Sequence, residues 1–261
     1  MLGRWGLRAA TVAVLAFLYI PIAIIFLYSF NGSRAQTWPI KDLTTKWYEL
    51  AFQNEAVREA FWLSIQAGLG ATTIAVLLGS LAALAVHRFG FFGRDAISFA
   101  LVLPIALPGI VTGIALSATI QGLGVGFSLT TIIIGHATFC VVIVYNNAIA
   151  RLRRTSRSLE EASMDLGADA LQTFRHVTLP ALATALLAGA MLAFALSFDE
   201  IIVTNFTAGT EQTLPIWILS NIKLPNQRPI VNVVAVVVIL LSAIPIYLAQ
   251  RLVGSEATST R

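Results

Sequence analysis

Six long apolar runs constrain the fold of this chain more than any other feature. Each run has roughly 20 residues, the length that an α-helix needs to cross the hydrocarbon core of a bilayer. Because 57% of the 261 residues are hydrophobic and only 11% are charged, the composition excludes a water-soluble globular domain. Backbone polar groups have no water partner in lipid, so we expect each run to be helical. The sequence predicts an all-α membrane protein with six transmembrane helices, in the runs 9–30, 60–86, 96–120, 127–150, 181–203 and 229–248.

Positive charge is distributed unequally between the two sides of these runs. Eleven of the 17 Lys and Arg residues fall at the chain ends and in the breaks 88–94 and 151–175, and the other six fall in the alternate breaks. Since Lys and Arg are enriched in cytoplasmic loops, both termini are predicted to be cytoplasmic.

The chain is predicted to have three parts. The first transmembrane helix and an extracytoplasmic loop occupy residues 1–59, a five-helix core occupies 60–250, and a cytoplasmic tail occupies 251–261. Trp38 and Trp47 in the loop are typical of side chains that lie at a membrane interface.

A polar segment (residues 158–180) separates the fourth run from the fifth. Two capping boxes can be drawn in it, Ser158 with Glu161 and Asp169 with Gln172, and each marks the start of a helix.

Gly167 lies between the two capping boxes and suits a left-handed turn at the end of the first helix. Pro180, preceded by Thr178, suits the first turn of the next long apolar helix because proline lacks a backbone N–H. The expected structure is two short helices that meet at Gly167, followed by a third helix.

Sequence motifs for chemistry are few. The chain has no G-x-x-x-x-G-K-[ST] loop for ATP, so any ATP hydrolysis is expected in a partner, and no metal site is indicated. No basic groove with interleaved aromatic residues suggests nucleic acid. His136 and Cys140 lie within the fourth run, where we interpret both as packing residues and His136 as hydrogen-bonded.

The polar segment resembles the coupling motif of binding-protein-dependent ABC importer permeases, E-A-A-x3-G-x9-I-x-L-P. Serine replaces the second alanine and valine replaces isoleucine, but the spacing is that of the family. The matching residues are Glu161, Ala162, Ser163, Gly167, Val177, Leu179 and Pro180.

This resemblance implies a type I ABC importer permease fold with a cytoplasmic coupling helix pair at 158–178. The implied partners are a second permease, two ATPase subunits that bind ATP and Mg, and an extracytoplasmic solute-binding protein. The chain would need no cofactor of its own and would lie in the bacterial inner membrane. Asp165 joins the motif residues as a candidate ATPase contact, because Glu161 and Asp165, four apart on a helix, favour a basic partner. That partner is either the nearby arginines 153, 154 and 157 or the ATPase surface.

Other strings resemble the polyamine branch of these permeases, which import spermidine and putrescine. They include S-F-D-E-I-I-V-T-N-F-T-A-G at 197–209, H-A-T-F-C at 136–140 and T-T-K-W-Y at 44–48. Gly109 departs from the branch, in which an aspartate often follows the preceding proline. The resemblance implies a small cationic solute.

Candidate residues of the substrate path are Asp199, Glu200, Pro108 and Gly109. A carboxylate pair at the rim of a span is costly unless it faces water, a partner or a cation. Asp199 and Glu200 are expected on one helix about 100° apart, so one of them faces the path, and Asp199 is preferred. An ion pair with Arg228 or simple exposure would also explain them.

Two other functions are consistent with six membrane helices. One is an ion-coupled secondary transporter with Asp199 as the ion site. It is disfavoured because the two halves of this sequence show no matched broken helices, and because the polar segment would have no purpose in it. The other is a membrane assembly protein without a transport role.

Overall fold

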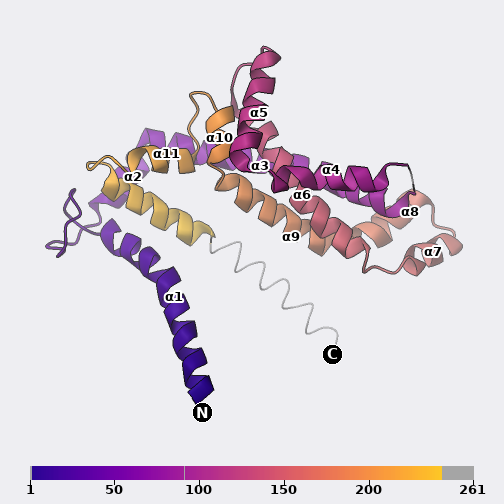
Figure 1. The fold of residues 1–261 in the computed structure, drawn as a ribbon, viewed down its shortest axis with the longest axis horizontal. Coiled ribbons are helices and arrows are strands. Elements are labelled where there is room, and N and C mark those ends of the chain that lie inside the picture. Colours follow the sequence, from indigo (N-terminus) through magenta and orange to yellow (C-terminus); the bar gives the residue numbers. More distant parts are fainter. Residues whose placement is uncertain (1, 91, 243–261) are drawn as a thin grey trace. The chain divides into compact units, whose positions relative to one another are not determined.

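The computed structural model describes residues 2–90 and 92–242, and these residues fold into helices joined by turns and loops (Figure 1). The predicted all-α class is confirmed. The helices are α1 (Leu2–Ser29), α2 (Lys46–Gln53), α3 (Glu55–Arg88), α4 (Arg94–Ala106), α5 (Gly109–Gly122), α6 (Leu129–Leu152), α7 (Ser158–Asp165), α8 (Ala170–Thr173), the π-helix η1 (Phe174–Thr178), α9 (Leu179–Phe198), α10 (Ile202–Thr207) and α11 (Leu214–Asn221).

Four helices are long and apolar enough to cross a membrane: α1, α3, α6 and the continuous helix Ala170–Phe198. The bent pair α4 and α5 and the shorter apolar helix Arg228–Ser242 account for the other two predicted runs. The end of the sixth run and the predicted tail 251–261 lie outside the described residues. Every predicted run thus corresponds to helical structure.

The third run, residues 96–120, contains Pro104 and Pro108 and forms two helices. It is broken after Ala106, and the two halves meet at an angle of 105°. Leu107 has an extended backbone with ψ 141°, as expected for a residue that precedes proline. Pro108 therefore determines where the helix ends.

The chain forms two compact units, one of residues 1–59 with 217–261 and one of residues 60–216. Within the described residues, each unit has contacts of its own. In the first unit, the Trp47 indole N–H donates to the Asn31 carbonyl at 2.7 Å, and Trp47 is 2% exposed. Trp47 is therefore a core residue of this unit, which corrects its expected place at the interface. Trp38 is exposed, as an interfacial ring must be. The predicted three-part division of the chain stays a prediction.

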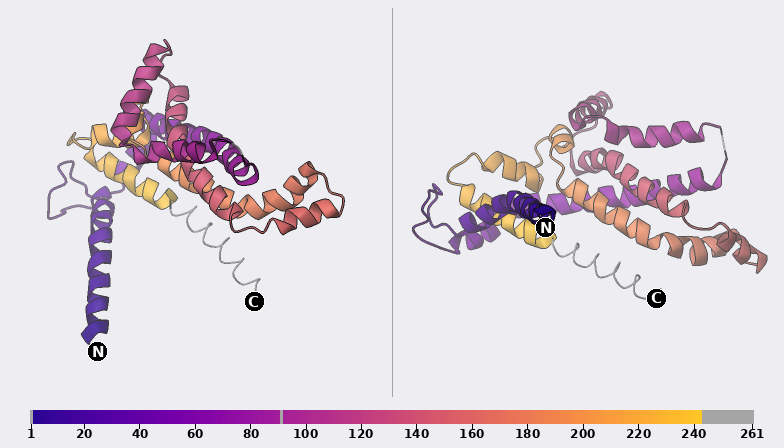
Figure 2. Two further views of the ribbon diagram at one scale, coloured as in Figure 1. Left: turned by 45° about the vertical axis from the view of Figure 1, so that its right-hand side comes forward. Right: turned by 60° about the horizontal axis from the view of Figure 1, so that its bottom comes forward.

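In the second unit, α3 and α9 both pack against α6 (Figure 2). A Cβ at Gly79 of α3 would lie 2.8 Å from the Val141 carbonyl oxygen and 3.0 Å from the Tyr145 nitrogen. Because that space is already taken by the backbone of α6, glycine is required for this approach of the two helices.

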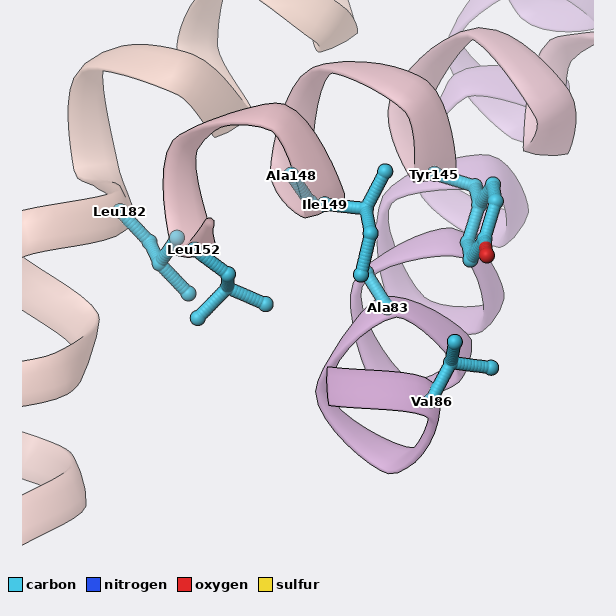
Figure 3. Close-up of a cluster of buried hydrophobic side chains, with 7 residues drawn as sticks. All are labelled: Ala83, Val86, Tyr145, Ala148, Ile149, Leu152 and Leu182. Atoms are coloured by element: carbon cyan, nitrogen blue, oxygen red, sulfur yellow. The ribbon is translucent and has the colours of Figure 1, made fainter. Parts of the chain in front are cut away.

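A buried apolar cluster joins the last turns of α3 and α6 to the first turns of α9 (Figure 3). The cluster is close to the place where the chain leaves α6 for the polar segment. The polar segment therefore begins beside a well-packed apolar core. Its members are Ala83, Val86, Tyr145, Ala148, Ile149, Leu152 and Leu182.

Candidate functional site

The polar segment begins with α7 and turns sharply at Gly167. The Gly167 N–H donates to the Met164 carbonyl at 2.9 Å and the Ala168 N–H donates to the Ser163 carbonyl at 3.1 Å, the pair of bonds of a Schellman turn. Gly167 has φ +93°, a left-handed conformation that glycine adopts without strain. The predicted turn at Gly167 is confirmed.

One of the two predicted capping boxes is formed. Asp169 accepts from the Gln172 backbone N–H at 2.7 Å, and the Gln172 side chain accepts from the Asp169 N–H at 2.9 Å. The box predicted at Ser158 is wrong, because Ser158 is already the first residue of α7. The Ser156 hydroxyl instead accepts from the Ser158 N–H at 3.3 Å, and the helix begins one residue earlier than expected.

The long apolar helix does not open at Thr178 and Pro180 as expected. It runs without a break from Ala170 to Phe198, and residues 174–178 form a π-helical turn within it. Because Pro180 has no backbone N–H, the wider π-helical turn before it costs no hydrogen bond at that position. The part of the polar segment after residue 170 is therefore continuous with α9.

Three polar side chains meet where the polar segment approaches the end of α3. Arg88 Nη2 donates to Glu160 Oε1 at 2.7 Å and to Thr178 Oγ1 at 3.0 Å, and Thr178 Oγ1 donates to Glu160 Oε1 at 2.6 Å. We call this the Arg88–Glu160–Thr178 cluster. Partial burial alone would raise the pKa of Glu160, but the hydrogen bonds from Thr178 and Arg88 and the Arg88 charge together lower it. Glu160 is therefore held in its ionised form.

A pocket of about 380 Å³ adjoins this cluster. Residues of α3, α6, α7, α8, η1 and α9 line it, and Leu152 and Leu182 of the apolar cluster in Figure 3 are among them. The pocket therefore lies between the polar segment and this apolar cluster.

Most residues of the coupling motif lie on the outer surface of the polar segment. Ser163 is half-buried and donates to or accepts from Thr173 Oγ1 at 3.2 Å. Two leucines near the turn add an apolar surface, since Leu166 is 91% exposed and Leu171 is 73% exposed. The exposed motif residues are Glu161, Ala162, Asp165, Gly167, Leu179 and Pro180.

Within the part of the chain that the structure describes, Glu161 makes one loose contact. Its carboxylate lies 3.7 Å from Arg157 Nε, and 61% of its side chain is exposed. Of the two predicted partners, the nearby arginines and the ATPase surface, the arginines supply this distant pair with Arg157. Most of the carboxylate surface is still available to another molecule.

The candidate acids of the substrate path lie in a helix break, not on one helix as expected. Helix α9 ends at Phe198 and α10 begins at Ile202. Glu200 Oε1 accepts from the Val203 backbone N–H at 2.9 Å, so its carboxylate serves as a cap for α10. Asp199 is exposed and follows the end of α9. The expectation that the two acids lie about 100° apart on one helix is therefore wrong. They differ instead in their bonding, because the Glu200 carboxylate caps α10 and Asp199 is exposed.

The other two candidates of the path lie near this break. Pro108 precedes α5, which packs along α10, and a Cβ at Gly109 would lie 3.7 Å from Ile202 Cγ2. The structure therefore brings the Pro108–Gly109 turn close to the residues that follow Asp199 and Glu200.

His136 stabilises the same break from α6. Its Nδ1 lies 2.7 Å from Ser197 Oγ and its Nε2 lies 2.8 Å from Thr204 Oγ1, and the ring is fully buried. Thr204 Oγ1 donates its hydrogen to the Glu200 carbonyl at 2.7 Å, so it accepts from His136 Nε2–H. The prediction of a hydrogen-bonded packing histidine is confirmed, and Cys140 is likewise buried.

Sequence reasoning missed Arg88, Glu160 and Thr178. In the sequence, Arg88 is only one of the cations in the break 88–94, and the motif includes Glu161 but not its neighbour Glu160. An isolated arginine at the end of an apolar run was the available signal, since such a residue needs either water or an acid nearby.

Comparison with known proteins identifies the family. A sequence model described as binding-protein-dependent transport system inner membrane component matches residues 75–256. The chain belongs to this family. It is a multi-pass inner membrane protein and a transport component, and its permease function follows from this membership.

Curated relatives cover almost the entire chain. The spermidine/putrescine transport system permease protein PotC of Escherichia coli (strain K12) is 34% identical over 260 residues, which are 99% of this chain and 97% of PotC. The putrescine transport system permease protein PotI of the same strain is 34% identical over 232 residues, 85% of this chain and 82% of PotI.

Two solved structures share the fold. A bacterial ABC transporter involved in the import of the acidic polysaccharide alginate is 19% identical with a TM-score of 0.68, covering 96% of this chain and 95% of that one. The inward-facing MetNI methionine ABC transporter is 17% identical with a TM-score of 0.60, covering 82% of this chain and 99% of that one. The expected type I importer permease fold is therefore confirmed.

Proposed function

We propose that the chain is the permease subunit of an ATP-driven importer of polyamines such as spermidine or putrescine. The observation that carries this proposal is the identity of 34% over 99% of the chain with a spermidine/putrescine permease. Asp199, which is exposed, and Glu200, which is partly buried, lie in the helix break between α9 and α10 and support a cationic solute, because a cation offsets the cost of a carboxylate near lipid.

The surface of the polar segment would bind the ATPase. Glu161 and Asp165 present carboxylates there, and Leu166 and Leu171 present apolar side chains. Such a combination of an apolar centre with charged neighbours is typical of a protein interface. The chain would contain no ATPase site, and ATP and Mg would be bound by two partner ATPase subunits.

A second permease and an extracytoplasmic solute-binding protein would complete the importer. The second permease would share the translocation path, and the binding protein would deliver the solute to its outer mouth. The excess of Lys and Arg in alternate breaks supports a cytoplasmic polar segment and cytoplasmic termini.

Asp199 is the better candidate for contact with the solute. The Glu200 carboxylate already accepts a backbone hydrogen bond from Val203, so a cation would compete with the cap for it. Asp199 is exposed and Pro108 and Gly109 belong to a turn close to the same break, so these residues would line one stretch of the path.

The test is a reconstituted complex of the permeases, ATPase and binding protein, assayed with a panel of amines and amino acids. Polyamines are expected to stimulate ATP hydrolysis and to accumulate in the vesicles, whereas neutral amino acids have neither effect. Stimulation by amino acids alone would contradict the assigned solute. Uptake that survives loss of the ATPase would favour an ion-coupled secondary transporter, and failure to co-purify any ATPase would favour an assembly protein.

A further inference from the structure

The Arg88–Glu160–Thr178 cluster joins three parts of the second unit that are far apart in the sequence. Arg88 is the last residue of α3, Glu160 lies in α7, and Thr178 is the last residue of η1, directly before α9. Each of the three polar atoms lies within 3.0 Å of the other two. Two membrane-spanning helices are thereby bonded to one short helix of the polar segment.

The directions of these hydrogen bonds are mutually consistent, and they favour an ionised Glu160 because both other residues donate to it. Its Oε1 accepts from both other residues, and the Thr178 hydroxyl donates to Glu160 while it accepts from Arg88. The side chains of Arg88 and Glu160 are 31% and 21% exposed, so water screens their attraction less than it screens an exposed pair.

The neighbouring pair Arg157 and Glu161 shows the contrast. Its closest atoms are 3.7 Å apart, and the two side chains are 78% and 61% exposed. Exposed pairs of this kind contribute little to stability, so they cannot hold α7 in one position. The shorter, partly buried bonds of the Arg88–Glu160–Thr178 cluster can hold it.

We propose that Arg88, Glu160 and Thr178 are positioning residues for transport, because they make α7 move together with α3 and α9. This inference rests on the proposed function, in which an ATPase acts on the surface of the polar segment. The turns at either end of α7 include Gly167, and a turn by itself would absorb part of an imposed movement. Side-chain bonds from α7 to the two spans transmit it instead, and α9 leads directly to the break that holds Asp199.

The first experiment measures how firmly α7 is held in place, without any solute. Amide hydrogen exchange is followed in α7 of the purified complex for wild type, Thr178→Val, which keeps the side-chain shape without the hydroxyl, and Thr178→Ser, which keeps the hydroxyl. Loss of hydrogen bonds to a charged group is expected to speed exchange by about ten-fold in Thr178→Val and in Glu160→Gln. Thr178→Ser should exchange as wild type does. Unchanged exchange in both impaired variants would overturn the proposal.

The second experiment measures polyamine uptake per ATP hydrolysed in vesicles. Thr178→Val and Glu160→Gln are expected to lower this ratio several-fold, and the exchange of charges in Arg88→Glu with Glu160→Arg should restore part of it. Asp95→Asn, a matched loss of one exposed carboxylate near the start of α4, serves as the control and should behave as wild type. A normal ratio in both impaired variants would overturn the proposal. If wild type imports no polyamine, the proposed solute is wrong, and the exchange measurement alone decides the role of the cluster.

Discussion

At the residue scale, two adjacent glutamates of the polar segment have different environments and therefore different expected roles. Glu160 is bonded to Arg88 and Thr178, and its side chain is 21% exposed. Glu161 is 61% exposed and has only a distant arginine partner. Because one helical residue turns the side chain by about 100°, neighbours in sequence face different surroundings. Glu160 therefore serves the fold of this chain, and Glu161 is available to a partner.

The carboxylate of Asp199 is predicted to attract the cationic solute. Asp199→Asn removes one charge while it preserves size, and a charged hydrogen bond of the usual strength corresponds to a rise of about ten-fold in the polyamine concentration for half-maximal uptake. The measurement is uptake against concentration in vesicles, with complex assembly checked by co-purification. Glu211→Gln, which removes another exposed carboxylate on the side predicted to be extracytoplasmic, is the matched control. Identical uptake curves for Asp199→Asn and wild type would leave Asp199 with a structural role.

At the element scale, the sequence predicted the positions of the apolar helices but not the break after Phe198. Hydrophobic runs determine which segments are buried in lipid, and this signal is strong because each run is long. The break after Phe198 was missed because residues 201–203 continue the apolar pattern. The cap of Glu200 on Val203 and the bond of Thr204 to His136 stabilise the break, and both depend on tertiary contacts that a local pattern does not contain.

The sharp end of α7 is predicted to require glycine at position 167. A β-branched side chain at φ +93° is strained by about 1–2 kcal/mol. In the described residues no atom lies within 4 Å of a Cβ built there, so the effect of Gly167→Val would come from the backbone and not from a clash. The expected result is that co-purification of the ATPase and uptake both fall, while the amount of permease in the membrane is unchanged.

Gly124 provides a matched control for this substitution. It also has a positive φ, +69°, and open space at its Cβ, but it lies in the turn between α5 and α6. Gly124→Val should therefore carry similar backbone strain and retain the ATPase. If Gly167→Val takes up solute normally, the turn has no part in coupling.

At the scale of the whole molecule, the distribution of Lys and Arg predicts how the chain lies across the membrane. Eleven of the 17 cations fall on the side that carries the polar segment, and such an excess retains loops in the cytoplasm. The loop between α3 and α4 is predicted to lie on that side, and the loop that holds Glu211 on the other. Single cysteines at Phe92, which is fully exposed, and at Glu211 would report the two sides, with the buried Cys140 replaced by alanine.

A membrane-impermeant maleimide applied to intact spheroplasts should label the cysteine at Glu211 and not the one at Phe92. Permeabilised cells should label both, which controls for accessibility within the protein. The opposite pattern would place the polar segment outside the cell, where no cytoplasmic ATPase could reach it. The coupling of α7 to α3 and α9 would then have no source of energy, so this one measurement tests the premise on which the transport mechanism depends.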